Sequence, residues 1–156
     1  MIVQNLGMDI EELLDAWRVN NALNLELLDI VADEDFELKP GKGKTIRSNF
    51  VHLVGVRKMW AEEKLKTDAA LIPKLDWKSA AREDLRRGLE QSSELMSNLF
   101  RKMHEGQRPG RSLLKFFAYC IAHEAHHRSQ IEIALRINAR EPDDAFLYGL
   151  WEWTKK

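Results

Sequence analysis

Apolar residues recur at the three- and four-residue spacing of an amphipathic helix in four stretches of this 156-residue chain, and strand patterns are almost absent. The stretches cover about 9–31, 45–66, 79–104 and 111–138. Each has one apolar side that must be buried, and four such helices are most simply buried as a four-helix bundle. We therefore expect an all-α fold that forms a single domain over residues 1–156.

Polar residues mark the start of the first two predicted helices. Asp9 is expected to cap the first, with Glu12 completing a capping box, and Thr45 or Ser48 is expected to cap the second. The connection over 32–44 contains proline and two glycines and is long for a compact domain. Such a connection permits a crossover and often lines a site, so a simple up-down-up-down order is not assumed.

Proline marks the other boundaries. Pro73 breaks the segment before the third helix, and a turn over 106–110 precedes the fourth, which is expected to begin at Arg111. Pro142 ends the fourth helix. The tail over 143–153 is short and aromatic, and we expect it to pack back onto the bundle.

Charge and cysteine content exclude several classes of partner. The chain has 24 Lys+Arg against 25 Asp+Glu, and neither sign forms a long block, so neither a nucleic-acid nor a membrane partner is expected. No apolar run approaches the roughly 18 residues of a membrane span, and the first residues lack a basic n-region and a cleavage site. One cysteine, Cys120, rules out an internal disulfide, which fits the cytoplasm.

The pattern H-E-A-H-H over 123–127 holds three of the five histidines of the chain. Helical residues four apart lie roughly 40° apart around the axis and about 6 Å along it, so His123 and His127 can face one metal ion. His126 points roughly 100° away and is expected on the surface or between helices. A catalytic site of the zinc type takes about three protein ligands. His52 is either the third ligand or a hydrogen-bonded core residue.

The same residues also spell H-E-x-x-H, the zinc-binding helix of metallopeptidases. In that interpretation Glu124 is the general base, and Glu141 or Glu152 supplies the third ligand. However, no strand-forming segment is available to align a peptide, and the following R-S-Q lacks the glycine and histidine of metzincins. Glu124 is better interpreted as a residue that supports a ligand or lines a pocket.

Three features together resemble the DinB/YfiT-like superfamily of metalloenzymes over nearly the whole chain. They are a histidine early in the second helix, H-x-x-x-H-R-x-Q over 123–130, and L-Y-G-L-W-E-W over 147–153. The resemblance implies a four-helix bundle, commonly a homodimer, in which His52, His123 and His127 bind one divalent metal, usually zinc or nickel. It also implies a small-molecule substrate, such as a low-molecular-weight thiol, because characterised members include thiol-dependent transferases and isomerases.

Other polar residues are candidates for the surroundings of the site. Cys120, one turn before the histidine pair, is either a fourth ligand or a small buried hydrophobe. Arg128 and Gln130 belong to the family pattern and can orient ligands or tie helices together. Asn21 and Asn24 interrupt the apolar stripe of the first helix, and either line a pocket or face solvent at its edge.

Two classes of function follow. The first is a metal-dependent enzyme that transfers a small thiol to an electrophile or hydrolyses a small molecule, and the alternative is a non-catalytic metal-binding stress or interaction protein. An open coordination position beside a solvent-connected cavity would favour the enzyme, whereas a fourth protein ligand would favour a structural site.

Overall fold

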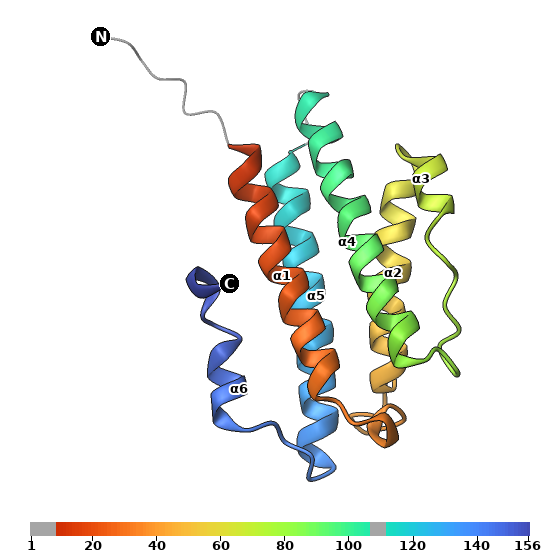
Figure 1. The fold of residues 1–156 in the computed structure, drawn as a ribbon, viewed down its shortest axis with the longest axis vertical. Coiled ribbons are helices and arrows are strands. Elements are labelled where there is room, and N and C mark those ends of the chain that lie inside the picture. The colour runs from red at the N-terminus through yellow and green to blue at the C-terminus, as the bar shows by residue number, and fades with distance from the viewer. Residues whose placement is uncertain (1–8, 107–111) are drawn as a thin grey trace.

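The computed structural model describes residues 9–106 and 112–156. Its long helices lie side by side (Figure 1) and are α1 Ile10–Ile30, α2 Ile46–Glu62, α4 Arg82–Glu105 and α5 Leu113–Ile137. The shorter elements are η1 Asp33–Asp35, α3 Lys66–Ala70, α6 Asp144–Gly149 and η2 Trp153–Lys155. These residues contain no strand, which confirms the all-α bundle. None of the described helices is long and apolar enough to cross a membrane.

Side-chain caps set the helix starts. Thr45 is the cap of α2, because its hydroxyl accepts a hydrogen bond from the Ser48 N–H at 3.1 Å. Asp9 caps α1 by accepting from the Glu11 N–H at 2.9 Å. Most of the turn predicted over 106–110, and the helix start predicted at Arg111, lie outside the described residues.

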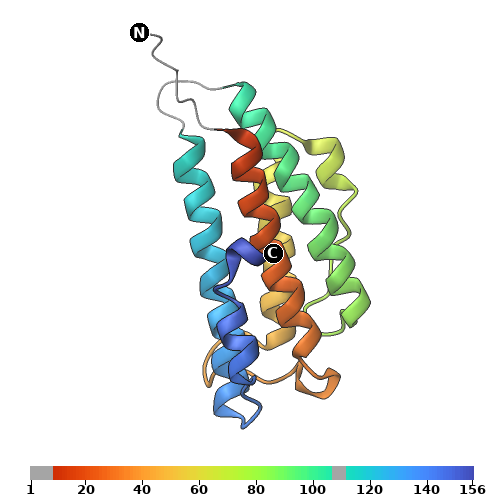
Figure 2. The same ribbon diagram turned by 60° about the vertical axis from the view of Figure 1, so that its left-hand side comes forward.

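The helices do not alternate in direction. In Figures 1 and 2, α1 and α5 run one way along the bundle, while α2 and α4 run the other. The two parallel neighbours, α2 and α4, are joined by residues 63–81, which include α3 and return along the length of the bundle.

The bundle therefore has a crossover, but residues 63–81 form it and not the connection over 32–44, which the sequence had suggested for this role. That segment joins ends of α1 and α2 that lie at the same end of the bundle. Its length is taken up locally, because the Ile46 N–H donates to the Leu38 carbonyl (2.9 Å) and the Arg47 N–H to that of Phe36 (3.0 Å). Phe36 is itself buried, so the segment folds down onto the start of α2.

The core lies between the four long helices. Trp17 and Phe100 are fully buried and meet edge to face, with ring centroids 5.3 Å apart. At Gly88 of α4, a Cβ atom would lie 3.2 Å from Val54 of α2 and 2.9 Å from Leu75. The absence of a side chain there lets α4 pack closely against both α2 and the crossover.

The C-terminal tail turns back along the outside of the bundle (Figure 2). Phe146 of α6 packs against the core, and the Lys156 ammonium pairs with Glu26 of α1 at 2.5 Å. No side chain of α6 is fully buried, and Trp151 is 82 % exposed. The tail thus covers one side of the bundle and leaves large apolar side chains facing solvent.

Candidate metal centre

The three histidines expected to bind a metal lie close together where α2 and α5 face each other, with His127 buried and the other two half-buried. His52 projects from α2, and His123 and His127 project from α5, with one ring nitrogen of each within 4.8 Å of the others. Ring centroids are 4.5 Å apart for His52 and His127, 4.6 Å for His123 and His127, and 5.4 Å for His52 and His123. Two nitrogens each about 2.0–2.1 Å from one zinc ion lie roughly 3.3 Å apart, so small side-chain rotations would close the cluster on an ion.

Asn49, one turn before His52 in α2, fixes the orientation of the His127 ring. Its side-chain nitrogen donates to the Thr45 carbonyl at 3.0 Å, which directs its oxygen toward His127 Nδ1, 2.8 Å away. With the proton on Nδ1, the Nε2 lone pair of His127 is free for an ion. Sequence reasoning missed Asn49, and the signal was a polar residue between the buried Ile46 and Phe50.

All three imidazoles have pKa values below the usual range. Burial, helped by the charges of neighbouring imidazoles and of Lys44, lowers the pKa of His127 to about 4. Burial also lowers the pKa of His52, with contributions from Lys44 and His123, and burial is the main cause of the lowered pKa of His123. The cluster is therefore neutral near pH 7, and neutral imidazole is the form that binds a metal.

The cluster lies between two hollows of different size. On one side, His52 lines an open cleft of about 550 Å³ together with Lys39, Gly43 and Lys44 of the long connection, Thr45 at the start of α2, and Trp77 of the crossover. On the other, His123 borders a hollow of about 10 Å³ beside Trp60 and Cys120, which has room for about one water molecule. A small molecule therefore has access from the His52 side.

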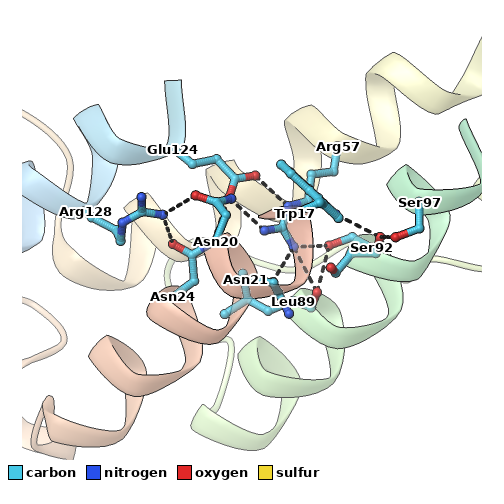
Figure 3. Close-up of polar contacts among 11 residues, drawn as sticks. Trp17, Asn20, Asn21, Asn24, Arg57, Leu89, Ser92, Ser97, Glu124 and Arg128 are labelled. Carbon is cyan, nitrogen blue, oxygen red and sulfur yellow. Dashed lines mark hydrogen bonds and ion pairs between the residues drawn. The ribbon is translucent and has the colours of Figure 1, made fainter. Parts of the chain in front are cut away.

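Glu124, between the two α5 ligands in sequence, is held by a buried polar network rather than by the histidines (Figure 3). Its carboxylate accepts two hydrogen bonds from Arg57 of α2, at 2.7 and 2.8 Å, and one each from the amides of Asn20 and Asn24, at 2.7 and 2.8 Å. Burial raises its pKa, but Arg57, Asn24 and Arg128 together outweigh burial and lower it. The carboxylate is ionised and fully engaged, so it is poorly placed to act as a general base.

Arg57 extends the network to α4. Its Nη1 donates to the side-chain oxygen of Asn21 at 2.9 Å, to the Leu89 carbonyl at 2.9 Å and to the Ser92 hydroxyl at 3.2 Å (Figure 3). Sequence reasoning missed Arg57. The signal was its place on the apolar stripe of α2, between the buried Val54 and Ala61.

Arg128 closes the network on the α1 side. It donates to the side-chain oxygens of Asn20 and Asn24, at 2.9 Å each. The sequence left open whether Asn21 and Asn24 line a pocket or face solvent. Both are buried core residues: Asn21 accepts a hydrogen bond from Arg57, and Asn24 donates to Glu124 and accepts from Arg128. Gln130 of the family pattern is half-buried and takes no part in these contacts.

The acidic third ligands of the metallopeptidase interpretation lie elsewhere. Glu141 pairs with Arg136 at 2.7 Å, and Glu152 pairs with Lys155 at 2.6 Å, all on exposed surface. Neither belongs to the group of histidines, whose third member is His52.

The remaining candidate ligands on α5 also stand apart from the cluster. His126 is exposed, and its ring contacts that of His127 at a centroid distance of 5.2 Å. Cys120 is buried, and burial raises the pKa of its thiol to about 12, so it stays protonated. Within the described residues, neither of them joins the ligand group.

Fold and site together define an all-helical bundle with a histidine cluster built from facing helices, the usual construction of metal sites in this architecture. The model of the DinB family matches residues 1–148. The chain therefore belongs to the DinB family. Comparisons with curated proteins and with solved structures gave no significant match.

Proposed function

We propose that this protein binds one divalent metal ion, zinc or nickel, through His52, His123 and His127, and uses it for enzymatic chemistry on a small molecule. The reaction we favour is transfer of a small thiol to an electrophile, and hydrolysis is the second possibility. The observation that carries the proposal is a cluster of three neutral imidazoles beside an open cleft, with no fourth histidine, cysteine or acidic ligand in the group among the described residues. Three ligands with one position open is the pattern of catalytic sites.

The ligand set suits thiol activation. A divalent ion held there would lower the pKa of a thiol or water in the open position, and neutral ligands leave its charge uncompensated, which favours an anionic fourth ligand. Asn49 keeps the His127 ring turned for binding. The engagement of Glu124 by Arg57 counts against a metallopeptidase mechanism, because the base of that mechanism must be free to take a proton from water.

The alternative function is that of a metal-binding interaction protein without a reaction of its own.

We also propose that the chain forms a homodimer in the cytoplasm. The observation that favours association is a set of large apolar side chains that face solvent. It includes Ile133, Ile137, Tyr148 and Trp151. Light scattering coupled to gel filtration measures the oligomeric state. The protonated, buried thiol of Cys120 suits a reducing compartment.

The test is metal content in matched histidine variants. Purified protein should carry about one metal ion; His127→Ala should lose it, whereas His126→Ala, one position away and outside the cluster, should keep it. Equal loss in both variants, or a wild-type protein that takes up neither zinc nor nickel, would refute the site.

Catalysis is tested separately. Metal-loaded protein should be stabilised by small thiols in a thermal-shift assay and should accelerate their addition to an electrophile. A protein that binds metal but neither binds nor uses thiols or other small molecules would fit the non-catalytic alternative.

A further inference from the structure

The cleft beside His52 has a one-sided charge. Lys39 and Lys44 both line it, and no aspartate or glutamate does. Neither lysine forms an ion pair with any described residue, whereas the nearby Arg47 is paired with Glu37 at 2.9 Å. Two cations therefore face the cleft without a carboxylate to balance them.

Glycine shapes the loop that carries these lysines. Gly41 has φ +65° and Gly43 has φ +142°, conformations that residues with a side chain rarely adopt. The turns they allow bring Lys39 and Lys44, which are separated by four residues, onto the same cleft, while Lys42 between them does not line it. Lys44 and His52 line the same cleft, which places this lysine near the cluster.

The cleft also offers a contact for the uncharged part of a ligand. Trp77 of the crossover lines the cleft and is 53 % exposed, and the Lys78 ammonium lies 4.9 Å from its ring centroid. An indole of this kind offers a flat apolar contact. The volume of about 550 Å³ falls within the range of small-molecule sites.

The geometry points to this cleft as a subsite for the anionic end of the substrate, a carboxylate or phosphate bound between Lys39 and Lys44 while the reacting group reaches the metal ion at His52. The inference rests on the proposed function for the identity of the reacting group. It adds the substrate class, a small organic anion, to that function.

The test uses three thiols of similar size and different charge on the zinc-loaded protein: 3-mercaptopropionate, 2-mercaptoethanol and cysteamine. Titration calorimetry at constant ionic strength should show the anionic thiol binding most tightly. Changing both Lys39 and Lys44 to glutamine should reduce its affinity by about tenfold and leave the affinity for 2-mercaptoethanol within about twofold. Lys42→Gln, which removes the same charge from the same loop outside the cleft, is the matched control and should change neither. Circular dichroism and zinc content verify that each variant is folded and loaded.

Retention of the charge preference in the double variant, or an equal loss in Lys42→Gln, would overturn the subsite. Competition by inorganic phosphate and by acetate distinguishes the two anion classes, and the stronger competitor identifies the group that the cleft takes. Metal-free protein titrated with succinate separates the two proposals. A lysine-dependent interaction there, with no thiol binding to the zinc form, would retain the subsite and remove the thiol chemistry.

Discussion

Replacing Glu124 with glutamine removes the only negative charge of the buried network and keeps the shape of the side chain. Glu124 and Arg57 are 3 % and 2 % exposed, and two hydrogen bonds join them. Removing one partner of a buried ion pair costs about 3–5 kcal/mol, because the other charge is left without compensation. In this network, the new amide would also direct donor hydrogens at groups that are themselves donors.

A loss of this size would be plain in denaturation. For a chain of this length, about 1 kcal/mol shifts Tm by roughly 2–4 °C, so Glu124→Gln should lower Tm by roughly 6–20 °C. Urea unfolding followed by circular dichroism, with a chelator present to remove any contribution from metal, gives the free energy of unfolding. The control is Glu132→Gln, two turns later on α5, where burial raises the pKa of the carboxyl. Because burial disfavours the ionised carboxylate there, removing its charge should not lower the stability.

The pH dependence has a definite sign. The pKa of Glu124 in the folded protein lies below the usual 4.5, so its contribution to stability is present above pH 4.5 and is lost as the pH falls through the lower folded value. The gap between wild type and Glu124→Gln should therefore narrow in acid. Equal stabilities at pH 7, or a gap that stays constant into acid, would refute the view that the ionised pair stabilises the fold.

Three further outcomes follow from the site. Asn49→Ala should weaken metal binding about 10–100-fold in chelator competition, and Asn49→Asp, which keeps an acceptor for His127 Nδ1, should restore most of it; no change in the alanine variant would contradict the orienting role. Metal-free protein should lose stability as the pH falls from 6.5 toward about 4, because the pKa of His127 is lower in the folded than in the unfolded state. In His127→Gln, the urea midpoint of unfolding should depend less on pH over this range. Cys120 should react with a disulfide reagent only after unfolding, since its thiol is buried and its pKa is about 12; rapid reaction of the native protein would show that the thiol is accessible.

The elements of the fold were predictable where local pattern decides them. The long amphipathic repeat of α4, with Leu85, Leu89 and Phe100 on one side, predicts a buried helix from sequence alone. The place of the crossover was not predictable in this way. Residues 32–44 have the length for a crossover, but hydrogen bonds onto the start of α2 fold them locally, and only tertiary packing reveals that 63–81 spans the bundle instead.

The candidate site likewise has residues that local sequence pattern predicts and residues that only tertiary packing reveals. His123 and His127 were paired by their spacing on one helix, whereas His52 needed the family resemblance, because no local rule says which residue of α2 faces α5. The partner of Glu124 was also beyond local reasoning. The spacing of Glu124 relative to the two histidines is that of a metallopeptidase base. What distinguishes Glu124 from such a base is its ion pair with Arg57, which is 67 positions away in the chain.

The ion pair and the histidine cluster involve the same two antiparallel helices, and this makes one depend on the other. His52 contacts His127, and Arg57, further along α2, contacts Glu124, which comes earlier in α5. Both contacts therefore require the same alignment of α2 against α5. A slip of one turn, about 5.4 Å, would break both. Before a metal arrives, the hydrogen bond between His127 and Asn49 joins the two helices at the cluster, and the buried ion pair adds a stronger, charged contact in the same register. We therefore expect Glu124→Gln to weaken zinc binding although Glu124 is no ligand. His127→Ala should abolish zinc binding and retain most of the stability of the metal-free protein. Unchanged zinc affinity in folded Glu124→Gln would show that the register is set elsewhere in the core.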